Sequence, residues 1–159
     1  MRESYETVYV TEKKSVAATL SGVVGARARE QGFFEGDGIA VTWCSGHIVE
    51  LAPPDGYDGW AKWDAGCLPM VPAEWSFLPR EGAQGQCETV CELLRRAGRI
   101  VCATDGDREG EGIFRRVYSF AGASAPVERL WASSTEPAAL AAALGQMRPG
   151  TDYDGLAAA

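Results

Sequence analysis

The stretch VCATDGDREGEGIF, residues 101–114, decides how the rest of the chain is to be understood. An apolar run stops at Thr104, and four carboxylates then follow at every second position: Asp105, Asp107, Glu109 and Glu111. The apolar run predicts a buried strand and residues 109–120 predict a helix, so the acids begin at the carboxyl end of a strand. Carboxylates this crowded repel one another and lose solvation on burial, so either they occupy a solvated turn or a cation lies among them. Mg²⁺ is the candidate cation because it takes oxygen ligands and needs only a few carboxylates.

Strand and helix patterns alternate on both sides of this stretch. The residue patterns predict strands over 7–11, 39–44, 99–104 and 127–131, and helices from Ser15, over 85–98, over 109–120 and from Thr135 to about Met147. Ser15 is the expected cap of the first helix, Gly98 the expected end of the second, and Pro137 lies in the first turn of the last. This order predicts an α/β domain with a mainly parallel sheet and chemistry at the carboxyl ends of its strands. Two predicted strands run into acids, the first into Glu12 and the third into Asp105.

Residues 45–80 interrupt the alternation. The segment is rich in Pro, Gly, Asp and Trp and has no sustained period. We expect a long ordered excursion that Trp60, Trp63 and Trp75 anchor onto the core. Cys87 and Cys91, one helical turn apart, are expected in the core and not at a metal.

Composition restricts the class of protein. The 159 residues, 46% of them hydrophobic, are enough for one domain with a sizeable core. The net charge of -7 should repel a polyanion, so any nucleic-acid affinity must come from elsewhere. Five cysteines without a CxxC pair and a single histidine favour a reduced, cytoplasmic protein over a zinc protein. No apolar run approaches about 18 residues, so no membrane span is expected.

Two other readings of the acidic stretch are weaker. A calcium loop of the EF-hand type begins in the same way, but its twelfth position is Arg116, where a bidentate glutamate is needed. In a phosphoaspartate phosphohydrolase Asp105 would be the nucleophile and Asp107 a general acid. That mechanism gives no role to Glu109.

Four blocks together identify a resemblance. They are TEKKS at 11–15, WCSGHIVELAPPDGYD at 43–58, ATDGDREGEGIF at 103–114 and RLWASS at 129–134. In this order they resemble the Toprim domain of type IA DNA topoisomerases, topoisomerase III in particular. The resemblance implies a Rossmann-like Toprim fold, with a mainly parallel sheet flanked by helices and a long Pro- and Trp-rich excursion. It also implies one domain over 1–159, with a core of about 5–134 and a helical extension over 135–159 that leads towards an absent next domain.

The same resemblance implies roles for individual residues. The implied Mg²⁺ ligands are Asp105, Asp107 and Glu109, with Glu111 as a lesser neighbour; the implied catalytic residues are Glu12, Lys13 and His47. Glu12 would exchange a proton with the 3′ oxygen of the broken strand, and Lys13 would contact the scissile phosphate. Arg108 is expected to screen the carboxylates, with contact to a phosphate as the alternative.

Two features depart from the family. The motif E-K-P-S has Lys14 in place of proline, which predicts a looser turn and an added charge for phosphate contact. None of the five tyrosines lies in a segment that resembles the family's nucleophile. We therefore expect a monomeric fragment that acts on single-stranded DNA only together with the remaining topoisomerase domains. A stand-alone Toprim nuclease or primase-like enzyme and a catalytically idle metal-binding module stay open as alternatives.

Overall fold

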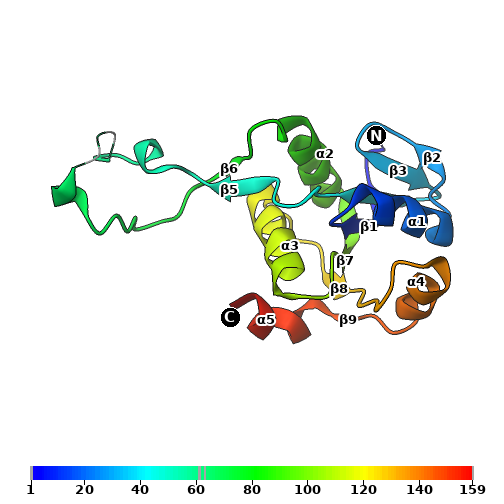
Figure 1. The fold of residues 1–159 in the computed structure, drawn as a ribbon. Helices are drawn as coiled ribbons and strands as arrows, with labels where there is room; N and C mark the ends of the chain where they lie inside the picture. Colours follow the sequence, from blue (N-terminus) through cyan, green and yellow to red (C-terminus); the bar gives the residue numbers. More distant parts are fainter. Residues whose placement is uncertain (1, 61, 63, 159) are drawn as a thin grey trace.

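The computed structural model describes residues 2–60, 62 and 64–158, and its body is built on a seven-stranded sheet (Figure 1). The strands, in sheet order, are β2 (Ala28–Arg29), β3 (Phe33–Gly36), β4 (Ile39–Trp43), β1 (Tyr5–Thr11), β7 (Ala97–Ala103), β8 (Val127–Arg129) and β9 (Arg148–Pro149). The four central strands, from β4 to β8, run parallel, and the edge strands pair antiparallel. The predicted mainly parallel α/β fold is confirmed.

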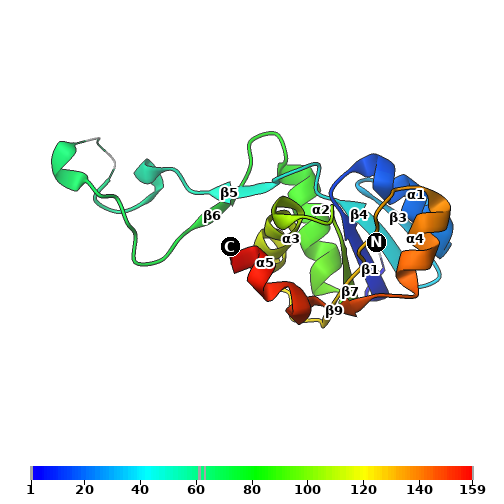
Figure 2. The ribbon, with the colours of Figure 1, turned by 60° about the horizontal axis from the view of Figure 1, so that its bottom comes forward.

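Helices cover both faces of the sheet, as Figures 1 and 2 show. The helices are α1 (Lys14–Val24), α2 (Gln84–Arg95), α3 (Arg108–Ala121), α4 (Pro137–Leu144) and the short α5 (Asp154–Ala158). One layer contains α1 and α4, which contact each other, and the opposite layer contains α2 and α3. Each layer buries its own apolar cluster against the sheet. Cys87 and Cys91 lie in the core on α2, as predicted, and burial raises the pKa of Cys91 to about 12.

Several helix boundaries differ from the prediction. The first helix is capped by Lys13 and not by Ser15, because the backbone N–H of Ala17 already donates to the Lys13 carbonyl. The second helix ends at Arg95 and not at Gly98, because residues from Ala97 onward join β7 and pair with β1. In the second case sheet pairing overrides the local glycine signal. The last helix has Pro137 in its first turn, as predicted, but it spans Pro137–Leu144 and not Thr135 to about Met147. Glu136, which precedes the proline, is extended, so the helix cannot begin before Pro137.

Residues 49–60, 62 and 64–79 form an arm that projects from the body (Figure 1). Its base is an antiparallel pair of strands, β5 (Val49–Leu51) and β6 (Phe77–Pro79). Between these strands lie two 3₁₀ turns, at Pro54–Gly56 and Ala65–Cys67. Trp75 is 54% exposed, and Trp60 packs on Tyr57 within the arm with ring centroids 5.4 Å apart. The expectation that these tryptophans anchor the segment onto the core is therefore wrong for Trp60 and Trp75. Trp63 lies outside the described residues.

Residues 135–158, expected as an extension, lie against the same body. α4 contacts α1, β9 pairs with β8, and α5 contacts α3. No helix in the part of the chain that the structure describes is both long and apolar enough to cross a membrane.

Candidate active site

The candidate site lies at the carboxyl edge of the parallel strands. Strands β1 and β7 are neighbours with Thr11 paired to Ala103, so Glu12 and Asp105 leave the sheet side by side. Lys13 joins them: its Nζ lies 2.6 Å from Asp105 Oδ2 and 3.9 Å from Glu12 Oε1. Three residues named from two distant motifs thus form one cluster, as parallel pairing requires.

Glu12 is the carboxylate most affected by its surroundings. Its side chain is only 17% exposed. Burial raises the pKa of Glu12, and the nearby Asp105 raises it further; Lys13 opposes the shift, while Asp107 and Glu109 add smaller contributions in the raising direction. The hydrogen bond to Asp105 is the main cause that raises the pKa of Lys13. The site therefore combines a carboxyl that holds its proton more tightly with a firmly charged ammonium.

The backbone around Glu12 is fixed from two sides. The Thr11 hydroxyl donates to the Lys13 carbonyl at 3.0 Å, and the backbone N–H of Ser45 donates to the Glu12 carbonyl at 2.7 Å. Lys14, the residue that replaces the family's proline, places its Nζ 5.3 Å from the centroid of the Trp43 ring. Its charge is thus engaged in a cation–π contact, and the expected phosphate contact has no support in this geometry.

A buried arginine holds the loop that carries Asp105. Arg129, whose side chain is fully buried, donates from NH1 to the carbonyls of Cys102 and Thr104 at 3.0 Å each and from NH2 to that of Asp105 at 2.7 Å. Its Nε lies 3.7 Å from Oε1 of Glu111, whose side chain is 2% exposed. Glu111 therefore points into the protein as the counter-charge of Arg129, and its expected place beside the metal ligands is wrong. Arg129 lies in the RLWASS block, but its role could not be predicted, because an exposed and a buried arginine look the same in sequence.

Asp107 and Glu109 belong to the start of α3. Asp107 is the N-cap, and its Oδ1 accepts the backbone N–H of Gly110 at 2.7 Å. Glu109 lies in the first turn with its side chain 73% exposed, where the helix dipole favours negative charge. Thr104 Oγ1 donates to the Gly110 carbonyl at 2.8 Å, so the strand end and the helix start are joined directly.

His47 follows β4 and lies on the Glu109 side of the cluster. Its Nε2 is 3.9 Å from Glu109 Oε1, and its Nδ1 is 3.3 Å from NH1 of Arg116. Burial lowers the pKa of His47 and the Arg116 guanidinium lowers it further, while Glu109 raises it. The structure thus brings His47 to Glu109, and Lys13 with Glu12 to Asp105.

The donor chemistry of this cluster fits Mg²⁺, although the full ligand set is not assembled. Among the described residues no three His, Cys, Asp or Glu side chains come together so that they could hold a metal ion. Asp105 Oδ2 is paired with Lys13, and one oxygen of Asp107 caps α3. Mg²⁺ commonly uses one or two carboxylates and completes its shell with water and substrate phosphate, so an open site of oxygen donors suits it.

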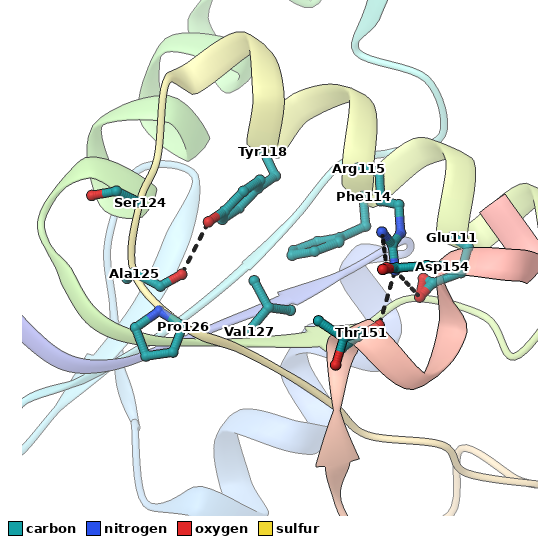
Figure 3. A pocket seen from close by; sticks show the side chains of 11 residues that line it. Glu111, Phe114, Arg115, Tyr118, Ser124, Ala125, Pro126, Val127, Thr151 and Asp154 are labelled. Carbon is teal, nitrogen blue, oxygen red and sulfur yellow. Dashed lines mark hydrogen bonds and ion pairs between the residues drawn. The ribbon is translucent and has the colours of Figure 1, made fainter. Parts of the chain in front are cut away.

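A separate cavity of about 280 Å³ lies between α3 and the segments 124–127 and 150–154 (Figure 3). Phe114, Tyr118 and Val127 form its apolar wall, and Arg115, Asp154 and Glu111 lie at its polar end. Arg115 donates to Asp154 Oδ1 at 2.6 Å and to the Gly150 carbonyl at 2.9 Å. The cavity is not lined by Glu12, Lys13 or Asp105, so it is distinct from the candidate site.

Comparison with known proteins identifies the class of domain. A family model described as the Toprim domain matches residues 7–135, which is most of the chain. The chain belongs to the Toprim domain family, and the resemblance on which the sequence analysis rested is confirmed.

The relatives that match over most of the chain are named DNA topoisomerase 3. The chain is 34% identical over 157 residues to DNA topoisomerase 3 of Haemophilus influenzae, covering 94% of this chain and 24% of that protein. It is also 34% identical over 154 residues to DNA topoisomerase 3 of Bacillus anthracis, covering 95% of this chain and 21% of that protein. Full-length topoisomerase I of Thermotoga maritima superposes with a TM-score of 0.51 at 21% identity, covering 89% of this chain and 21% of that one, which shows the shared fold. The chain spans only about a fifth to a quarter of the length of these relatives.

Proposed function

We propose that this chain is the Toprim part of the active site of a type IA DNA topoisomerase similar to topoisomerase 3. In this proposal Asp105, Asp107 and Glu109 hold Mg²⁺, Glu12 moves the proton and Lys13 binds the scissile phosphate. The observation that carries it is the contact between Lys13 and Asp105 at 2.6 Å, which lies beside Glu12 and joins residues 92 positions apart. A cation and a proton carrier then lie beside Asp105, the first of the proposed oxygen ligands.

Each residue contributes a physical effect to strand cleavage and rejoining. The alkoxide of a 3′ oxygen is a poor leaving group, and a carboxyl whose pKa is raised, as that of Glu12 is, can give it a proton and take the proton back on rejoining. The Lys13 ammonium neutralises charge that develops on the phosphate. When bound, Mg²⁺ would supply further positive charge to the phosphate oxygens.

The rest of the activity is assigned to other parts of the enzyme. The net charge of -7 opposes binding to a polyanion, so we propose that single-stranded DNA is held mainly by the remaining topoisomerase domains. The nucleophilic tyrosine belongs to those domains as well. The isolated chain should bind Mg²⁺ without relaxing DNA.

Metal binding is tested by titrating the chain with Mg²⁺ while following thermal unfolding. A ligand that binds only the native state stabilises it, by about 2.7 kcal/mol at 100 times its Kd. We expect this gain in the wild type and its loss in the double variant Asp105→Asn, Asp107→Asn. Asparagine keeps the N-cap of α3, so the variant should remain folded.

The matched control removes the same charge elsewhere. Glu30 and Glu50 are exposed and lie outside the site, so Glu30→Gln, Glu50→Gln should keep the Mg²⁺ response. An unchanged response in the Asp105, Asp107 variant would refute the metal assignment. In a parallel assay with supercoiled plasmid and Mg²⁺, relaxation by the pure chain would show a missed nucleophile, and nicking alone would favour the nuclease alternative.

A further inference from the structure

Arg116 is a residue that neither the motif nor the proposed mechanism uses, yet it contacts the site. It lies on α3 seven positions after Glu109, which places both on the same face of the helix. His47 lies against both: Nδ1 is 3.3 Å from Arg116 NH1, and Nε2 is 3.9 Å from Glu109 Oε1. Nδ1 thus faces a hydrogen-bond donor, and Nε2 faces a carboxylate that can only accept when ionised.

The chemistry of these neighbours restricts where the ring proton sits. A guanidinium has five N–H donors, no acceptor, and does not deprotonate in proteins. Nδ1 can therefore bond Arg116 only as an acceptor without a proton. The single proton of a neutral imidazole must then be on Nε2, the nitrogen that faces the Glu109 carboxylate.

We propose that Arg116 is a positioning residue that fixes His47 in the Nε2–H tautomer. His47 then serves as a hydrogen-bond donor directed at the Glu109 side of the site, and it is not the base of the reaction. The Nε2–H of His47 would donate to an anionic oxygen of a phosphodiester. This assignment of the ligand rests on the proposed function. Proton transfer is left to Glu12, which lies on the Lys13 side.

The arm keeps Arg116 in place. The Arg116 guanidinium lies 5.7 Å from the centroid of the Phe77 ring, and Phe77 belongs to β6 at the base of the arm. A guanidinium held over an aromatic face loses rotamer freedom and gains a cation–π contact. The base of the arm therefore helps to orient the ring of His47 through Arg116.

The tautomer can be read directly because the chain contains one histidine. The chain is labelled with ¹⁵N-histidine and measured at about pH 8, where an imidazole with the ordinary pKa near 6.5 is neutral. Long-range ¹H–¹⁵N spectra then show one pair of ring-nitrogen resonances. We expect a protonated Nε2 and an unprotonated Nδ1 whose resonance is displaced by the hydrogen bond. In Arg116→Met, which keeps an unbranched side chain over Phe77, the Nδ1 displacement should disappear and the second tautomer should become populated.

The control is Arg80→Gln. Arg80 is a nearby charge that also lowers the pKa of His47, but its hydrogen bond to the Ile48 carbonyl comes from its backbone N–H and survives the substitution. This variant should leave the Nδ1 resonance in place, and Glu109→Gln should leave the tautomer unchanged. A wild-type spectrum with a protonated Nδ1, or an Arg116→Met spectrum that superposes on wild type, would overturn the proposal. Because this readout needs neither DNA nor metal, it fails or succeeds independently of the proposed function.

Discussion

At the scale of single residues, Gly110 explains why the acidic motif needs a glycine. The Cβ of any other residue would collide with the carbonyl oxygen of Asp105, because the strand end and the start of α3 are in direct contact there. Gly112, on the same helix, has open space around it. We expect Gly110→Ala to lower the free energy of unfolding by about 1–3 kcal/mol, as overpacking does, or by more, since the contact is with backbone. Gly112→Ala should instead stabilise by up to about 1 kcal/mol through helix propensity.

Urea unfolding of the two variants beside wild type measures both changes. Equal effects of the two substitutions would contradict the close approach of Asp105 to Gly110.

Glu12 gives a prediction about pH. Because the pKa of Glu12 is raised in the folded state, the native state is favoured while Glu12 is protonated, and this contribution is lost as the pH rises through the folded pKa. Above that pH the ionised Glu12 destabilises the fold, so Glu12→Gln should stabilise the metal-free chain by about 1 kcal/mol near pH 7. The gain should vanish on acidification below the ordinary glutamate pKa of about 4.3.

Thermal unfolding as a function of pH tests this, with the exposed Glu50→Gln as the matched control. A gain that persists unchanged in acid would show that charge at Glu12 is not its cause.

At the scale of elements, the arm is separable from the body. None of residues 52–76 belongs to either apolar cluster in the described part of the chain, and β5 and β6 already pair Leu51 with Phe77. Replacing 52–76 by Asn-Gly would close this pair as a two-residue hairpin. We expect the free energy of unfolding of the shortened chain to lie between that of wild type and about 2 kcal/mol above it, since each halving of a loop recovers only about 0.6 kcal/mol of closure entropy. Phe77 should stay against Arg116.

Urea unfolding measures the stability of the shortened chain, and the His47 ring spectrum reports whether Arg116 stays in place. A large loss of stability would mean that the arm contributes to the core.

At the scale of the whole molecule, the parallel sheet predicts a gradient of protection. β1 is paired on both sides, by β4 and β7, whereas β9 is an edge strand next to β8. In native-state hydrogen exchange the amides of Val8, Val10, Ile100 and Cys102, all within buried strands, should be the slowest and approach the global unfolding free energy. The amides of β2, of Arg148 in β9 and of the arm should exchange through local opening, and equally slow exchange at Arg148 would contradict this order.

The amino-acid sequence by itself determined the type and order of the main elements and the acids that end two of the strands. Those features are local: they depend on periodicity, caps and turn residues, so Pro137 and the Asp105 strand end could be predicted. Local signals gave wrong predictions for the helix boundaries at Ser15 and Gly98, because backbone hydrogen bonding decides where a helix begins and ends. They also gave a wrong prediction for the packing of Trp60 and Trp75, because burial depends on the tertiary structure.

Only the tertiary structure decided which side chains meet. Strand order makes β1 the neighbour of β7, and this alone brings Lys13 to Asp105 across 92 positions. Burial turned Glu111 inward to Arg129, and helix packing placed Arg116 against His47. These contacts join elements that are distant in sequence, so no local pattern predicts them. Each depends on which helices and strands pack against one another through their apolar faces.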